Sequence, residues 1–170
     1  MAVLDLGTPV LPALREALGV GAPAARRLAA EVLGLHGDLP AAAGLEGLVR
    51  DRRQPVEVRH AAAAALGRIG SPTSTDLLVR LLGTAELRCT AAEALGRIGD
   101  PFAVPALAAG LAAVDPAVRT AMAAALAALG GEGRAALTRL AGGSGPGPDA
   151  ARAALDAVAV ASRRGGLVAA

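Results

Sequence analysis

Apolar residues recur every three or four positions in a series of short segments, and most of these segments end at a glycine. This spacing places the apolar side chains on one face of a helix. In the segment that ends at Gly70, for example, Val58, Ala62, Ala65 and Ile69 fall on one side at 100° per residue. The pattern predicts amphipathic helices along the chain and no sheet.

The same segment recurs along the chain. Three copies match closely: VRHAAAAALGRIG at 58–70, LRCTAAEALGRIG at 87–99 and VRTAMAAALAALG at 118–130. The arginine in the second position of each copy has equivalents on both sides, at Arg26, Arg59, Arg88, Arg119 and Arg152. A period of about 31 residues is typical of a repeat architecture of stacked helices.

Each copy is followed by a second helical pattern, GSPTSTDLLVRLL at 70–82 and GDPFAVPALAAGL at 99–111. Ser71-Pro72 and Asp100-Pro101 combine an N-cap residue with proline at the first helical position, and the preceding glycine suits a left-handed helix end. We call the first pattern the A helix and the second the B helix. A helices are predicted near 23–36, 55–69, 85–98, 116–129 and 149–162. B helices are predicted near 9–18, 40–50, 72–83, 101–113 and 132–141.

The combined pattern, VRxxAAxALGxIG followed by DPxAVPAL, resembles the short HEAT-like repeat of the phycobilisome-lyase type, over roughly residues 9–162. The resemblance implies an all-α fold, an α-solenoid of about four antiparallel helix pairs with half-repeats at its ends. Stacking would bury a continuous core that one short pair cannot bury alone. The predicted repeat array covers 1–141, with a half-repeat at 9–18 and repeats that start near 23, 55, 85 and 116. After it we predict a Gly/Pro linker at 142–148, a capping helix at 149–162 and a tail at 163–170.

Composition and charge limit the classes of function that we expect for this chain. The net charge is +2, with one Phe, no Trp or Tyr and a single Cys. A surplus of two cations and no aromatic pair to stack a base make nucleic-acid binding the least favoured class. No apolar run reaches the length of a membrane span, and the first residues lack a signal-peptide pattern, so we expect a cytoplasmic protein. The absence of Lys and Asn beside abundant Ala, Gly and Arg suggests a GC-rich bacterial source.

The arginine ladder is the most regular polar feature. Acids lie just before four of its members, at Glu57, Glu86, Asp115 and Asp149. We expect a structural role, with each guanidinium bonded to carboxylates or carbonyls that tie successive repeats together. An exposed anion-binding stripe is the alternative.

Catalytic and metal chemistry find little support. His60 and Cys89 occupy equivalent positions in adjacent repeats, about 10 Å apart for neighbouring helices. A Cys–His pair needs hydrogen-bond reach, and a metal needs three or four ligands. We therefore expect no catalytic residue, no metal and no cofactor.

The candidate partner site is the surface of the B helices, which we expect to line the concave side. Its predicted residues are Phe102, Pro105, Ala109, Asp76, Arg80 and Arg139. Alternatively, Phe102 packs into the core at the start of its own helix. The predicted function is a non-catalytic scaffold or adaptor that binds a protein or peptide, with a homo-oligomer left possible. The alternative that the resemblance implies is an accessory or chaperone-type protein of the bilin-lyase family.

Overall fold

The computed structural model describes the chain from Val10 to Gly166, and every regular element in that range is helical. The A helices are α2 (Pro23–Leu35), α4 (Val56–Ile69), α6 (Arg88–Ile98), α8 (Pro116–Ala128) and α10 (Pro146–Gly166). The B helices are α1 (Val10–Val20), α3 (Ala42–Arg50), α5 (Thr75–Leu81), α7 (Val104–Gly110) and α9 (Gly131–Ala141). Single turns of 3-10 helix, η1 (Leu39–Ala41), η2 (Pro72–Ser74) and η3 (Pro101–Ala103), precede α3, α5 and α7. The all-α prediction is confirmed.

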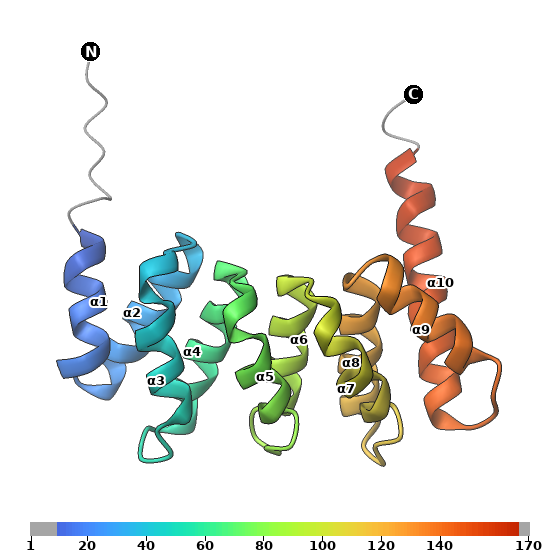
Figure 1. The fold of residues 1–170 in the computed structure, drawn as a ribbon, viewed down its shortest axis with the longest axis horizontal. Helices are drawn as coiled ribbons and strands as arrows, with labels where there is room; N and C mark the ends of the chain where they lie inside the picture. Colours follow the sequence, from blue (N-terminus) through green and yellow to red (C-terminus); the bar gives the residue numbers. More distant parts are fainter. Residues whose placement is uncertain (1–9, 167–170) are drawn as a thin grey trace.

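The helices form two rows. Figure 1 shows α3, α5 and α7 in front of the fainter α4, α6 and α8. Along the A row, α2 packs on α4, α4 on α6 and α6 on α8, and each of these helices also packs on the preceding B helix. The core lies between the rows and is built mainly of leucine. Its fully buried leucines include Leu45, Leu66, Leu78, Leu95, Leu107, Leu126 and Leu137. The predicted α-solenoid is therefore confirmed.

Adjacent A helices touch through glycine and alanine. A Cβ atom added at Gly67 would lie 2.5 Å from the Cα of Ala94 on the next A helix. Gly34 meets Ala65 and Gly96 meets Ala125 in the same way, at 2.7 and 3.0 Å. Because no side chain separates the backbones at these points, the A helices lie very close together.

The B helices are spread apart by comparison. Contacts between α3 and α5, and between α5 and α7, are sparse. The A helices thus pack more closely on one another than the B helices do, and the expectation that B helices line the concave side stays a prediction.

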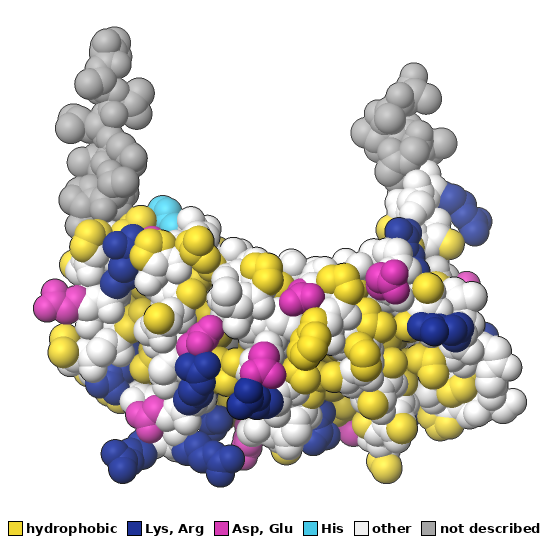
Figure 2. Space-filling model, viewed as in Figure 1, with side chains coloured by type: hydrophobic (Ala, Val, Ile, Leu, Met, Phe, Trp, Pro, Cys, Tyr) yellow, Lys and Arg dark blue, Asp and Glu magenta, His cyan; other side chains and the backbone are white. Residues whose placement is uncertain are grey.

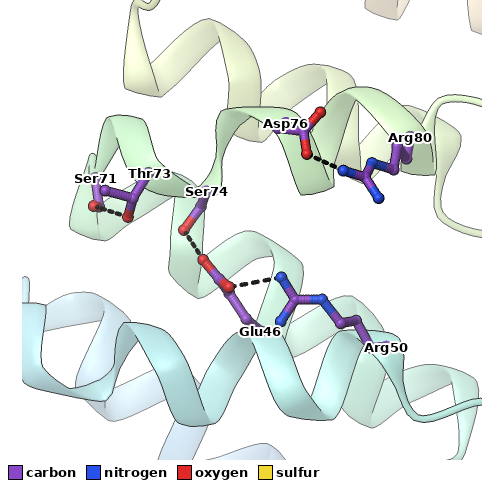
Figure 3. A network of polar contacts seen from close by, with 7 residues as sticks. All are labelled: Glu46, Arg50, Ser71, Thr73, Ser74, Asp76 and Arg80. Carbon is purple, nitrogen blue, oxygen red and sulfur yellow. Dashed lines mark hydrogen bonds and ion pairs between the residues drawn. The ribbon is translucent and has the colours of Figure 1, made fainter.

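A polar contact bridges the gap between α3 and the next B helix. The Ser74 hydroxyl, fully buried, donates to Oε1 of Glu46 at 2.9 Å, and Arg50 donates to the other oxygen of Glu46 at 2.8 Å (Figure 3). In the same view Asp76 and Arg80 pair along α5. Hydrogen bonds thus help to join successive repeats in the B row, as glycine–alanine packing joins them in the A row.

The last helix begins earlier than predicted. α10 starts at Pro146 and continues to Gly166, so the predicted linker shortens to 142–145 and the predicted tail at 163–170 begins inside the helix. Pro146 suits the first turn of a helix, where its missing N–H is not needed. α10 packs on both α8 and α9, which makes it the last member of the A row.

The Gly–Ala contact gives the first prediction. Gly67→Ala should lower the free energy of unfolding by about 1–3 kcal/mol, because the new methyl group overlaps Ala94 and forces α4 and α6 apart. Gly47→Ala is the matched control: no atom lies within 4 Å of its added Cβ, so it should raise stability by about 0.5–1 kcal/mol. Urea unfolding of both variants measures the difference, and equal stability of the two would contradict close A-row packing.

Candidate functional site

Phe102 is the single aromatic residue of the chain and it is exposed. It lies in η3, just before the B helix of the third full pair, and 65% of the residue is open to solvent. The Asp100 carboxylate accepts a hydrogen bond from the Phe102 N–H at 3.0 Å, which fixes the turn. The alternative that Phe102 packs into the core is therefore wrong.

The other predicted partner-site residues lie on the same face. Pro105 and Ala109 are exposed on α7. The flanking B helices carry the exposed charged residues, which are Asp76 and Arg80 on α5 and Arg139 on α9. Figure 2 shows apolar side chains over α7, with acidic and basic groups over α5 and basic groups over α9. We call this set of six residues the B-face patch. The structure places it on the B-helix side, and whether a partner binds there stays a prediction.

An open pocket lies beside Ala109, where no sequence motif predicts one. It has a volume of about 590 Å³ and lies between the end of α7 and the start of α10. Its walls include Leu111, Val114, Leu140 and Pro146. No local pattern could have revealed it, because residues some 30 positions apart meet only after α10 packs against the stack.

The A-helix side carries charges of both signs. A second open pocket, of about 540 Å³, lies across α2, α4 and α6 and is lined by Arg27, Glu31, Glu57, His60, Arg68 and Glu93, among others. His60 Nδ1 lies 2.7 Å from the Thr90 hydroxyl, so its hydrogen bond goes to Thr90 and not to Cys89. Among the residues that the structure describes, no group of three or more His, Cys, Asp or Glu side chains could hold a metal ion.

The ladder arginines bond to carbonyl oxygens at the ends of B helices. Arg59 Nε donates to the Val49 carbonyl at 3.1 Å, and Arg88 Nε donates to the Leu82 carbonyl at 2.6 Å. Arg26 donates to the Gly19 carbonyl. Arg119 donates to the carbonyls of Ala113 and Val114, and Arg152 to those of Ala141 and Gly143. A helix C-terminus carries partial negative charge and unpaired carbonyls, which a guanidinium satisfies.

The acids that precede the ladder arginines contribute less than expected. Among the ion pairs within residues 10–163, Arg152 pairs with Asp149, whereas Glu57, Glu86 and Asp115 do not pair with their arginines. Asp115 instead accepts the Ala117 N–H at 2.8 Å and caps α8. The contacts are mainly between arginine and carbonyl because the side chain extends along the helix end, toward the preceding B helix.

A buried ion pair near the first repeat was not singled out from the sequence. Arg15 donates from Nε and Nη2 to the two carboxylate oxygens of Asp38, at 2.7 and 2.6 Å, and Asp38 is 6% exposed. The hydrogen bond from Arg15 holds the pKa of Asp38 below its usual value. Nearby, hydrogen bonds from the Gln54 side chain and the Arg53 backbone lower the pKa of Asp51. The Arg15–Asp38 contact ties α1 to the loop between α2 and η1, and the Asp51 contacts fix the loop after α3; neither set forms a reactive site.

The ladder gives the second prediction. Arg88→Ala should lower the free energy of unfolding by about 1.5–3 kcal/mol, because it removes a charge-assisted hydrogen bond and leaves the Leu82 carbonyl unpaired. Arg97→Ala on the same helix is the control, since Arg97 is exposed and such changes stay within about 0.5 kcal/mol. Chemical unfolding measures both. An unchanged stability of Arg88→Ala would favour the anion-binding alternative for the ladder.

The Asp38 contact gives the third prediction, a dependence on pH. A lowered folded-state pKa stabilises the fold above the ordinary Asp pKa of about 3.9, and that contribution disappears as the pH falls through the folded-state value. Asp38→Asn should therefore cost about 1.5–3 kcal/mol at pH 7, and the difference from the wild type should shrink below about pH 4. Unfolding curves between pH 7 and pH 3 test this. A difference that is constant over the whole range would exclude the charged pair as its cause.

Comparison with known proteins supports the helical-repeat architecture. A family model of HEAT repeats matches residues 11–86 and 83–159. No curated protein sequence matches the chain significantly. Within residues 10–166 no helix is both long enough and apolar enough to cross a membrane.

Two of the solved structures that are similar to this chain illustrate the fold. One is a chain in the complex of CpcE and CpcF of phycocyanin lyase from Nostoc sp. PCC7120, 27% identical, with a TM-score of 0.63 over 87% of this chain and 63% of that chain. The chain thus spans a little under two thirds of the length of that lyase chain. The other is human deoxyhypusine hydroxylase in complex with glycerol, 21% identical, with a TM-score of 0.44 over 86% of this chain and 83% of that chain. The family match extends over most of the helical array, and the chain belongs to the HEAT-repeat family.

Proposed function

We propose that this HEAT-repeat protein is a non-catalytic scaffold that binds a protein or peptide through the B-face patch. The observation that carries the proposal is the exposure of Phe102, 65% open to solvent on a rigid turn. A large aromatic side chain left on the surface, with apolar neighbours at Pro105 and Ala109, is typical of an interaction surface.

The surroundings of Phe102 support this role. Asp76 and Arg80 on one side and Arg139 on the other place charge at the rim of an apolar centre. Protein interfaces have this arrangement, in which buried aromatic and arginine side chains contribute most of the binding free energy. The Asp76–Arg80 pair is exposed at both members, so it orients a partner more than it stabilises the fold.

The chemistry of the remaining surface favours recognition over catalysis. A nucleophile needs a base within hydrogen-bond reach, and His60, which occupies the position equivalent to Cys89 on the adjacent A helix, is hydrogen-bonded to Thr90. The pocket beside Ala109 is lined almost wholly by aliphatic side chains and backbone, and such a lining suits an inserted apolar side chain.

The fourth prediction tests this surface. Tagged protein carrying Ala109→Glu should lose the partners that the wild type retains from a lysate of its source organism, because binding would bury an unpaired carboxylate. Phe102→Ala should weaken the same interactions by about 2 kcal/mol or more, the loss typical of an aromatic hot spot.

Ala117→Glu is the matched control, since Ala117 is exposed on α8 in the other row and the same charge change there should leave binding intact. Mass spectrometry identifies the retained proteins, and circular dichroism checks that all three variants keep their helix content. Equal retention by the wild type, Ala109→Glu and Phe102→Ala would refute the B-face patch.

A second candidate function follows from the similarity to the CpcE–CpcF complex of phycocyanin lyase, which is 27% identical to this chain. Under this alternative the chain is an accessory subunit of a lyase of that type and acts together with a second chain. Co-expression with a bilin and an acceptor phycobiliprotein tests it. Bilin absorbance that appears on the acceptor only when this chain is present would support the lyase role over the scaffold role.

A further inference from the structure

The apolar pocket beside Ala109 contains one charged side chain, that of Arg119, and its other polar side chain is Ser144. Both hydrogen bonds of Arg119 come from Nη1, which donates to the Ala113 carbonyl at 2.7 Å and to the Val114 carbonyl at 2.6 Å. Its Nη2 and Nε atoms make no hydrogen bond within residues 10–163, and neither atom is buried. The guanidinium therefore has donors free for a further acceptor.

Two other ladder arginines line open pockets, and both of those pockets also contain acids. Arg26 shares its pocket with Glu16 and Asp51. Arg59 shares its pocket with Glu86. By contrast, no acidic side chain of the described residues lines the pocket at the end of α7. The positive charge in that pocket is thus left without a nearby negative charge from the chain itself.

A guanidinium among aliphatic walls favours a ligand that carries a carboxylate close to an aliphatic group. Attraction between opposite charges is stronger where apolar walls exclude water, and arginine binds carboxylates through paired hydrogen bonds. The pocket volume of about 590 Å³ is in the range of small-ligand sites. One pocket of this kind can take both groups only if they lie within a few bonds of each other.

The last residue of a polypeptide meets this condition, because its side chain and its carboxylate are attached to the same Cα atom. Within an extended segment, by contrast, a leucine and the acid next to it point to opposite faces of the backbone. They could not enter the same pocket together. The chemistry of the pocket therefore fits a chain terminus better than an internal acidic motif.

We propose that the protein binds the C-terminus of a partner polypeptide, with an aliphatic last residue in this pocket and its carboxylate on Arg119. The inference rests on the proposed function, since Ala109 belongs both to the pocket and to the B-face patch. The rest of the partner segment would run along α7 toward Phe102. The seven residues between Ala109 and Phe102 span about 10–12 Å, which three or four residues of extended chain cover.

Selection from a library of random hexapeptides displayed with free C-termini, on the purified whole chain, tests this inference. Selected peptides should end in leucine, isoleucine or valine. A selected peptide with its free carboxylate should bind about 10–100-fold more tightly than the same peptide as a carboxamide, because the amide loses a charge-assisted hydrogen bond. One glycine added after the last residue should weaken binding similarly, because it separates the carboxylate from the side chain. Fluorescence anisotropy measures all three affinities.

Val114 allows the charge in the pocket to be changed without disturbing the core. It lines the pocket, its carbonyl accepts from Arg119, and it is 95% exposed. Val114→Glu should weaken binding of the free acid about 10-fold, because the new carboxylate repels the ligand and competes for the guanidinium. Val114→Lys should not weaken it, and both variants should change the affinity of the carboxamide by less than about twofold.

Val20→Glu and Val20→Lys are the matched controls, since Val20 is 80% exposed at the end of α1, far along the stack from the pocket. These controls should bind the free acid as the wild type does. Circular dichroism verifies that all four variants keep their helix content. Weaker binding by Val20→Glu than by Val114→Glu would place the carboxylate at the other end of the array and overturn the proposal.

Two further results would overturn C-terminal capture. One is a selection without preference at the last position, or equal affinity for the free acid and the carboxamide. The other is selection of peptides with an internal acid beside leucine that bind equally as acid and amide, which would put a side-chain carboxylate in the pocket.

The lysate experiment separates this inference from the proposed function. Partners that are lost with Phe102→Ala, together with a library that shows no C-terminal preference, would leave the B-face patch standing and overturn C-terminal capture alone. Carboxylate-dependent peptide binding, together with lysate partners that neither Phe102→Ala nor Ala109→Glu removes, would support the pocket and refute the wider patch.

Discussion

The close approach of adjacent A helices is the constraint on which the rest of the structure depends. Gly34, Gly67 and Gly96 each meet the backbone of an alanine on the next helix, and even one methyl group at these points would overlap it. Contact at this distance fixes both the spacing and the rotation between repeats. It also explains why the chain is so rich in alanine, since larger side chains on these faces would separate the helices.

The B row is held together differently. Its helices make few direct contacts with one another, buried leucines pack behind them, and polar bridges such as Glu46–Ser74 join them. The ladder arginines bond to the ends of the same helices, where they satisfy carbonyls that no further turn of helix can reach. Phe102 lies exposed on this row.

The two ends of the array are unequal for the same reason. At α10 the position that is glycine on α2, α4 and α6 is Val160, and the position that is alanine on the earlier A helices is Asp156, so another A helix cannot approach closely there. On α2 apolar residues lie exposed at positions that are buried on later A helices, and Leu28 and Leu35 add to them. The α10 end is thus built to stop stacking, whereas the α2 end is more apolar.

The sequence by itself determined the helices and their order. Period, glycine caps and Ser-Pro or Asp-Pro starts located every helix between 10 and 166, because these signals act within one or two turns of the chain. Only the tertiary structure decided that the A helices pack more closely than the B helices, that Phe102 is exposed, and that Arg15 meets Asp38 across 23 residues. Helix spacing, exposure and long-range pairing depend on how closely the backbones of different repeats approach. That distance is set by packing between helices, which no local pattern encodes.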